Sequence, residues 1–110
     1  MFWTKWAMAR VALILLALCA AGPALAEVDR AKAATLERLV IQDCGSCHGL
    51  TLKGGLGRPI TPDLMQHYDR EVLRDIILDG IPGTAMPPWR PLMSETEALW
   101  IADYLRGVPE

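Results

Sequence analysis

The stretch Cys44-Gly45-Ser46-Cys47-His48 decides how this 110-residue chain is organised. The pattern C-x-x-C-H is the attachment site of a c-type haem. Its two thiols add to the vinyl groups at one porphyrin edge and form two thioethers, and one helical turn can present both sulfurs. The histidine that follows supplies an axial ligand to the iron. The five residues therefore predict one covalent haem c bound by Cys44 and Cys47, with His48 on the iron.

A c-type haem that transfers electrons commonly has a methionine thioether as its second axial ligand. Met65, Met86 and Met93 follow the motif. Met86 lies in residues 81–89, where prolines and a glycine exclude a regular helix and Pro87 favours an extended conformation. Met65 falls in a predicted helix, where a core methionine is expected, and Met93 fits either a core position or a ligand. We predict Met86 as the ligand, with a buried loop methionine as the alternative.

A C-x-x-C pair also occurs in zinc sites and in thioredoxin-like redox motifs. A zinc site would need Cys44, Cys47, His48 and His67 together, and the adjacent Cys47 and His48 do not fit the usual paired spacing. A thioredoxin-like motif requires a βαβ context, and the sequence has no convincing strand pattern. Haem attachment is therefore the favoured interpretation.

The first 26 residues have the pattern of a secretory signal. Lys5 and Arg10 are basic, residues 11–21 are apolar, and Ala24-Leu25-Ala26 has the form of a cleavage site. The apolar stretch is shorter than a transmembrane helix requires. We predict a signal peptide over 1–26 and a mature haem domain over 27–110 in the periplasm, without stable membrane insertion after cleavage. An uncleaved anchor is the alternative.

Removal of the signal changes the net charge from −2 to −4, because nine basic residues then face thirteen acidic ones. This mild acidity argues against nucleic-acid binding. The two cysteines that remain both belong to the haem motif, so no structural disulfide is expected. A domain of this size has a marginal side-chain core, to which a buried haem adds apolar volume. We predict a monomer with one haem.

The regular elements that the sequence predicts before residue 69 are two helices and a loop. Apolar residues spaced by three and four indicate a first helix over residues 29–42, before the haem motif. Glycines and prolines indicate a loop over residues 49–62. A short helix is expected from Pro62 or Asp63 to Tyr68.

Two later helices are bounded by capping residues. Asp69 and Gly80 are expected to cap a helix over residues 70–79. Ser94-Glu95-Thr96-Glu97 has capping-box spacing and starts a last helix that ends near Arg106 and Gly107. Its aromatic residues, Trp100 and Tyr104, share a face and are expected in the core against the first helix. The chain is predicted to be a small all-α domain around one haem.

These features together resemble the class I monohaem cytochromes c. A narrower resemblance, to small periplasmic cytochromes of the c-fifty-five-X type, rests on the flanked haem motif (residues 42–50), on Gly54-Gly55-Leu56-Gly57 and on the proline-rich residues 82–91. The resemblance implies electron delivery to the haem c/haem d nitrite reductase of denitrifying bacteria, with an upstream quinol-linked donor. It equally implies a role in maturing the haem d of that reductase.

The resemblance also implies residues around the haem. Class I relatives often have Gly-Pro after the haem loop, where a carbonyl accepts the free ring N–H of the ligand histidine. In this chain Arg58 separates Gly57 from Pro59, so either Pro59 in a shifted register or another carbonyl would serve. Arg58 and Arg90 are candidates for propionate contacts and Trp89 for packing on the haem. Exposed cations and an ordinarily packed loop indole are the alternatives.

Three functions are compatible with these residues. The leading hypothesis is a one-electron carrier whose iron stays bound by His48 and Met86 in both oxidation states. The second is a factor in haem d maturation. An enzyme or gas sensor would need an open iron site, and no distal acid–base pair is evident in the sequence. We predict an electron-transfer protein that docks redox partners and is not an enzyme.

Overall fold

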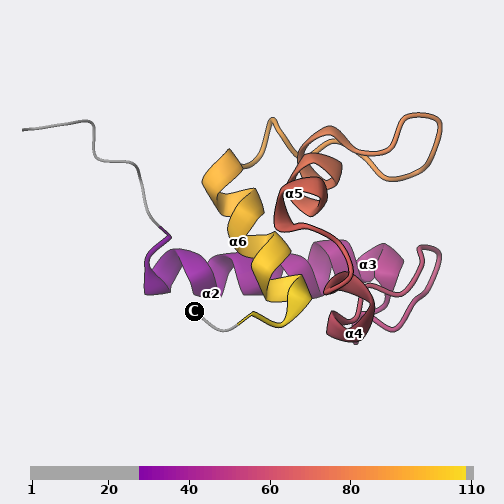
Figure 1. Ribbon diagram of the computed structural model, residues 1–110, viewed down its shortest axis with the longest axis horizontal. Helices are drawn as coiled ribbons and strands as arrows, with labels where there is room; N and C mark the ends of the chain where they lie inside the picture. Colours follow the sequence, from indigo (N-terminus) through magenta and orange to yellow (C-terminus); the bar gives the residue numbers. More distant parts are fainter. Residues whose placement is uncertain (1–27, 109–110) are drawn as a thin grey trace, which may run out of the picture.

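The computed structural model describes residues 28–108 (Figure 1), and the predicted signal peptide lies outside them. The helical segments are, in chain order, α2 (Arg30–Leu39), the π-helical η1 (Val40–Cys44), α3 (Gly45–His48), α4 (Pro62–Met65), α5 (Arg70–Asp79) and α6 (Glu95–Arg106). Residues 28–108 contain no strand. The all-α prediction is confirmed.

The first helix is longer than the sequence predicted. It begins at Arg30, one residue after the predicted start, with Asp29 as its N-cap, and it continues past Gln42 through η1 and α3. The haem motif therefore lies inside a continuous helical rod (Figure 1). The Gly45 N–H donates to the Val40 carbonyl five residues back, which widens the turn by one residue, as π-helical turns at functional sites often do. The rod ends at Gly49, whose φ of 89° suits glycine.

The other helices follow their capping residues. Helix α4 starts with Pro62 but ends at Met65, so it is shorter than the predicted helix to Tyr68. Helix α5 has the predicted bounds, although the Asp69 side chain makes no capping hydrogen bond. Helix α6 has the complete capping box: Ser94 accepts from the Glu97 N–H, and the Glu97 carboxylate accepts from the Ser94 N–H. These caps act within a few residues, which is why the sequence could identify them.

Helix α6 packs against α2, α4 and α5, and Figure 1 shows it beside these helices. The buried core contains Leu36, Val40, Ile60, Met65, Leu73, Ile77, Leu78, Met93, Ala98, Ile101, Ala102 and Leu105. Trp100 and Tyr104 do pack toward α2, but both stay half-buried at the edge of the core. The prediction that they are core residues was therefore wrong, because α2 presents small alanines to them and leaves the rings partly open.

Within residues 28–108, no helix is both long and apolar enough to cross a membrane.

Candidate haem-binding site

The two motif cysteines lie one turn apart on the helical rod, and neither forms a disulfide among the described residues. Cys44 is half-buried at the end of η1, and Cys47 is exposed one turn later on α3. Burial raises the pKa of the Cys44 thiol to about 11, and the nearby Asp43 carboxylate adds to this shift. Ser46 Oγ donates to the Asp43 carbonyl at 2.7 Å and ties this turn together. One helical turn thus presents two sulfurs, one against apolar surroundings and one toward solvent.

The His48 imidazole is held by a backbone carbonyl. Its Nδ1 lies 2.7 Å from the carbonyl oxygen of Arg58. A carbonyl can only accept, so Nδ1 carries the proton and donates, and Nε2 keeps a lone pair for a metal. The sequence left this acceptor open between Pro59 and another carbonyl. The structure places it at Arg58, one residue before the proline.

Glycine at position 57 makes this approach possible. A Cβ on Gly57 would lie 2.9 Å from His48 Nδ1 and 3.0 Å from its Cε1, too close for any larger residue. The Gly57 N–H also donates to the Cys47 carbonyl at 2.7 Å. This role of Gly57 was not predicted from the sequence, where Gly57 belonged only to the strings that carry the family resemblance. The sequence signal for this role was the position of Gly57, nine residues after His48 and next to Arg58, whose carbonyl accepts the hydrogen bond.

We call residues 49–61 the histidine-side loop. Besides the Gly57 contact, its Gly54 N–H donates to the His48 carbonyl at 2.7 Å, and its Ile60 N–H donates to the Leu52 carbonyl at 2.9 Å. A Cβ on Gly49 would lie 2.5 Å from the Gly54 carbonyl oxygen, so the loop closes tightly on the end of α3. The loop is therefore bonded directly to the backbone of the haem motif.

We call residues 80–90 the methionine-side loop. It leaves α5 at Gly80, where φ is 67° and a Cβ would lie 2.6 Å from the Met86 carbonyl oxygen. Pro82 and Gly83 form the corner of a turn in which the Thr84 N–H donates to the Ile81 carbonyl at 3.1 Å. Thr84 Oγ1 donates to the Ile81 carbonyl at 2.7 Å and accepts from the Met86 N–H at 3.3 Å. These bonds fix the backbone on the N-terminal side of Met86.

The three candidate methionines occupy different environments. Met65 and Met93 are 5% and 8% exposed and belong to the hydrophobic core. Met86 is half-buried, and the methionine-side loop to which it belongs lies at the same end of the molecule as α3 in Figure 1. Because Met65 and Met93 are occupied in the core, the partial exposure of Met86 supports it as the methionine that can reach a metal.

The other predicted haem neighbours are placed as follows. Pro59 and Arg58 are exposed in the histidine-side loop, and Trp89 is half-buried against the core. The Arg90 guanidinium forms a two-point ion pair with Asp79, with Nε–Oδ1 at 2.8 Å and Nη2–Oδ2 at 3.0 Å. Of the two arginines, Arg58 is the one whose side chain makes no hydrogen bond or ion pair within the described part of the chain.

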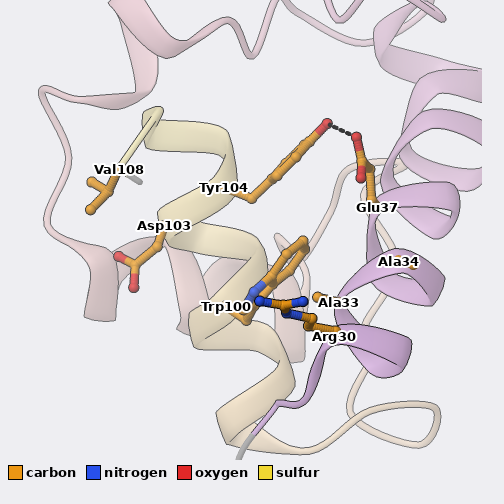
Figure 2. Close-up of a pocket in the computed structure, with 8 residues that line it drawn as sticks. All are labelled: Arg30, Ala33, Ala34, Glu37, Trp100, Asp103, Tyr104 and Val108. Atoms are coloured by element: carbon orange, nitrogen blue, oxygen red, sulfur yellow. Dashed lines mark hydrogen bonds between the residues drawn. The ribbon is translucent and has the colours of Figure 1, made fainter. Parts of the chain in front are cut away.

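A groove of about 480 Å³ lies elsewhere, between α2 and α6 (Figure 2). It contains no residue of the haem motif or of the two loops. The stacked rings of Trp100 and Tyr104 form one wall, with centroids 5.3 Å apart. The Tyr104 hydroxyl donates to Glu37 at 3.3 Å, and Asp103 pairs with Arg70 and Arg106. Two acidic residues of the groove thus join helices: Glu37 links α2 to α6, and Asp103 links α6 to α5.

The residues at the motif fit a c-type haem. Two thiols and an imidazole with a fixed tautomer lie on one turn, and a thioether lies in a braced loop at the same end of the domain. When bound, the haem supplies reversible one-electron exchange between Fe(III) and Fe(II). The contribution of the chain is to attach the group, orient the imidazole and limit solvent access.

Comparisons with known proteins agree with this site. A family model described as "Cytochrome C oxidase, cbb3-type, subunit III" matches residues 31–105. The chain is 60% identical over 99 residues to "Cytochrome c55X" of Paracoccus denitrificans, a match that covers 89% of this chain and 94% of that protein.

Two solved structures are also similar to the chain. The "c-type cytochrome NirC" superposes with a TM-score of 0.69 at 47% identity, over 72% of this chain and 93% of that one. The "Dihydro-heme d1 dehydrogenase NirN in complex with DHE" superposes with a TM-score of 0.60 at 30% identity, over 66% of this chain but only 16% of that one. With these relatives and this site, the chain belongs to the cytochrome c family, among the cytochromes c55X, and is an electron-transfer protein with covalent haem c rather than an enzyme.

Proposed function

We propose that this cytochrome is a periplasmic one-electron carrier that serves dissimilatory nitrite reduction. In this proposal Cys44 and Cys47 form the thioethers, and His48 and Met86 are the axial ligands. The observation that carries the ligand assignment is the hydrogen bond from His48 Nδ1 to the Arg58 carbonyl, because it leaves Nε2 free and oriented. The braced loop around Met86 supports the second ligand.

Two strong ligands suit an electron carrier. If both stay bound in Fe(III) and Fe(II), little rearranges on electron transfer. A thioether ligand raises the reduction potential relative to harder ligands. Both ligand loops lie at one end of the domain, so a partner that docks there approaches the haem edge (Figure 1). Redox partners of this kind use small, transient interfaces.

The periplasmic location is supported by the secretory pattern of residues 1–26 and by covalent attachment of haem, which takes place on the exported side of the bacterial membrane. The link to nitrite reduction is supported by the identity to cytochrome c55X and by the sequence strings that resemble this family.

The first test is the visible spectrum of the purified protein in both oxidation states, with and without carbon monoxide. A c-type reduced spectrum, a weak far-red iron–thioether band when oxidised and no response to carbon monoxide are expected. Met86→Ala should remove the far-red band and allow carbon monoxide to bind. Met93→Ala, a core methionine, is the matched control and should keep the band. Ready binding of carbon monoxide to the unmodified protein would exclude the closed carrier and favour a gas sensor or another open-site haem.

A second candidate function is electron acceptance during haem d maturation. It is favoured by the structural likeness to part of a protein named dihydro-heme d1 dehydrogenase. A dehydrogenation releases two electrons, which a one-electron carrier accepts in two successive encounters. A deletion strain separates the two roles. Purified nitrite reductase that lacks haem d supports maturation, whereas a complete reductase that receives no electrons in the cell supports delivery.

A further inference from the structure

The ion pair between Asp79 and Arg90 joins the two ends of the methionine-side loop. Asp79 is the last residue of α5, and Arg90 follows the proline-rich segment after Met86. The two-point contact has N–O distances of 2.8 and 3.0 Å, and Arg90 Nη1 also lies 3.6 Å from Glu95 at the start of α6. The pair is partly solvent-exposed, with side-chain exposures of 49% for Arg90 and 57% for Asp79.

Backbone hydrogen bonds continue this closure. The Trp89 N–H donates to the Ile77 carbonyl at 3.1 Å, and the Arg90 N–H donates to the Leu78 carbonyl at 3.0 Å. These carbonyls belong to the last turn of α5, where carbonyls have no partner within the helix. The returning end of the methionine-side loop therefore caps α5. The start and end of the loop are held together as a closed stem.

The position of Asp79 is electrostatically unfavourable without Arg90. A carboxylate at the C-terminal end of a helix faces the negative end of the helix dipole. The last turn of α5 contains no basic residue that would compensate. Arg90 supplies the missing cation from the far end of the loop, and its hydrogen bond lowers the pKa of Asp79. The arrangement couples the end of α5 to closure of the loop.

The stem also determines where Met86 lies. The Met86 carbonyl accepts from the Ile81 N–H at 3.3 Å and lies against Gly80, next to the stem. We propose that Arg90 is a positioning residue for the methionine ligand: its pair with Asp79 keeps the methionine-side loop closed and thereby keeps Met86 on the iron. This inference rests on the proposed function, which assigns Met86 as the ligand.

The experiment compares haem-loaded Arg90→Gln, Asp79→Asn, the double variant and Arg90→Lys with the unmodified protein. Arg74→Gln is the matched control, because Arg74 forms an exposed ion pair with Asp75 on α5 outside the loop. The readouts are the affinity of the reduced protein for carbon monoxide, the far-red band, and hydrogen exchange of the Trp89 and Arg90 amides. Carbon monoxide affinity scales with the fraction of molecules in which the methionine is dissociated.

Arg90→Gln is expected to raise carbon monoxide affinity roughly fivefold, as for loss of one good exposed ion pair, and to speed exchange of both amides. Asp79→Asn should have a smaller effect, because Arg90 keeps its place at the end of α5. The carbon monoxide affinity of the double variant should lie between those of the two single variants, because the double variant lacks the Asp79 carboxylate that Arg90→Gln leaves unpaired. Arg90→Lys should raise carbon monoxide affinity less than Arg90→Gln does, because lysine keeps the charge but not the two-point geometry. Arg74→Gln should change none of the three readouts.

Two results would overturn the inference. If Arg90→Gln matches Arg74→Gln in carbon monoxide affinity and in amide exchange, the stem does not hold the ligand. If Arg90→Gln lowers the free energy of global unfolding but leaves carbon monoxide affinity unchanged, the pair stabilises the whole fold and not the closed loop. An unmodified protein without a far-red band is a distinct outcome, because it refutes the Met86 assignment and with it the premise.

Discussion

The two loops that border the haem motif are built in different ways. The histidine-side loop bonds to the backbone of Cys47 and His48, within ten residues of the motif. The methionine-side loop bonds to itself and to the end of α5, and no hydrogen bond joins it to residues 44–48 in the described part of the chain. The histidine is therefore organised by its own sequence neighbourhood, whereas the methionine depends on how α5 and α6 pack. We expect the methionine to be the ligand that dissociates first.

The largest effect is expected from a substitution in the histidine-side loop. Gly57→Ala places a methyl group 2.9 Å from His48 Nδ1 and should push the imidazole away from the Arg58 carbonyl. The expected loss is about 3 kcal/mol of unfolding free energy, from overpacking and a broken hydrogen bond. The reduction potential should also change, because the ligand imidazole loses its partner. Denaturant unfolding and a redox titration measure these effects.

Gly83→Ala is the matched control for Gly57→Ala. Nothing lies within 4 Å of a Cβ at position 83, so only the positive φ of 78° opposes the substitution. Its cost should be about 1 kcal/mol, and the hydrogen bond from His48 to the Arg58 carbonyl should stay intact. Equal effects of the two substitutions would refute the claim that position 57 is fixed by the imidazole.

The next largest effect should come from the methionine side. Gly80→Ala imposes a positive φ of 67° on alanine and places its Cβ 2.6 Å from the Met86 carbonyl oxygen. We expect the loop to shift, at a cost of about 2 kcal/mol, so that carbon monoxide affinity rises roughly thirtyfold. The hydrogen bond of His48 should persist, because no atom of the histidine side is near Gly80. A carbon monoxide titration measures the first effect. A carbon monoxide affinity equal to that of the unmodified protein would contradict the expectation.

Features that depend on neighbouring residues were predictable from the sequence. The haem motif identified the attachment site, and the caps around α5 and α6 identified those helices, because a cap is formed within three or four residues. The extension of the first helix was missed. The π-helical turn at Val40–Cys44 differs from an ordinary turn by one residue and leaves no mark in the pattern of apolar side chains.

Features that depend on distant residues were not predictable. The pair of Asp79 and Arg90 spans eleven positions across a loop, and only the folded stem brings the two side chains together. The partial exposure of Trp100 follows from the small alanines that α2 places opposite it, which depends on how the two helices cross. The acceptor for His48 shifted to Arg58 because carbonyl placement depends on the path of the loop and not on residue type.

A smaller effect is expected from the Thr84 hydroxyl in the methionine-side loop. Thr84→Val keeps the shape of the side chain but removes the hydroxyl that donates to the Ile81 carbonyl and accepts from the Met86 N–H. The expected cost is about 1 kcal/mol of loop closure, which corresponds to a roughly fivefold rise in carbon monoxide affinity. Thr51→Val is the control, because Thr51 is exposed in the histidine-side loop and its hydroxyl makes no hydrogen bond among the described residues. If both variants bind carbon monoxide alike, Thr84 does not brace the ligand.

The smallest expected effect lies in the helical scaffold, away from both loops. Glu97 accepts from the Ser94 N–H and pairs with Lys32 of α2 at 3.1 Å. The backbone hydrogen bond, assisted by Lys32, lowers the pKa of Glu97 from its ordinary value of 4.5. A lowered pKa means that the folded state favours the carboxylate. Its contribution is therefore complete above pH 4.5 and is lost as the pH falls through the lower pKa of the folded state.

Glu97→Gln should therefore cost about 0.5 kcal/mol at neutral pH, because glutamine can still cap the helix but cannot pair with Lys32. The difference in unfolding free energy between the variant and the unmodified protein should vanish at acid pH, where the protonated Glu97 is as neutral as the glutamine that replaces it. Glu71→Gln is the control, since this carboxylate in the first turn of α5 makes no side-chain hydrogen bond among residues 28–108. Denaturant unfolding between pH 3 and pH 7 measures the difference, with pH steps of about one unit. Carbon monoxide affinity should be the same for Glu97→Gln and the unmodified protein at each pH, because Glu97 joins α2 and α6 without contacting either ligand loop. A difference between the two proteins would show that the methionine-side loop depends on this contact between α2 and α6.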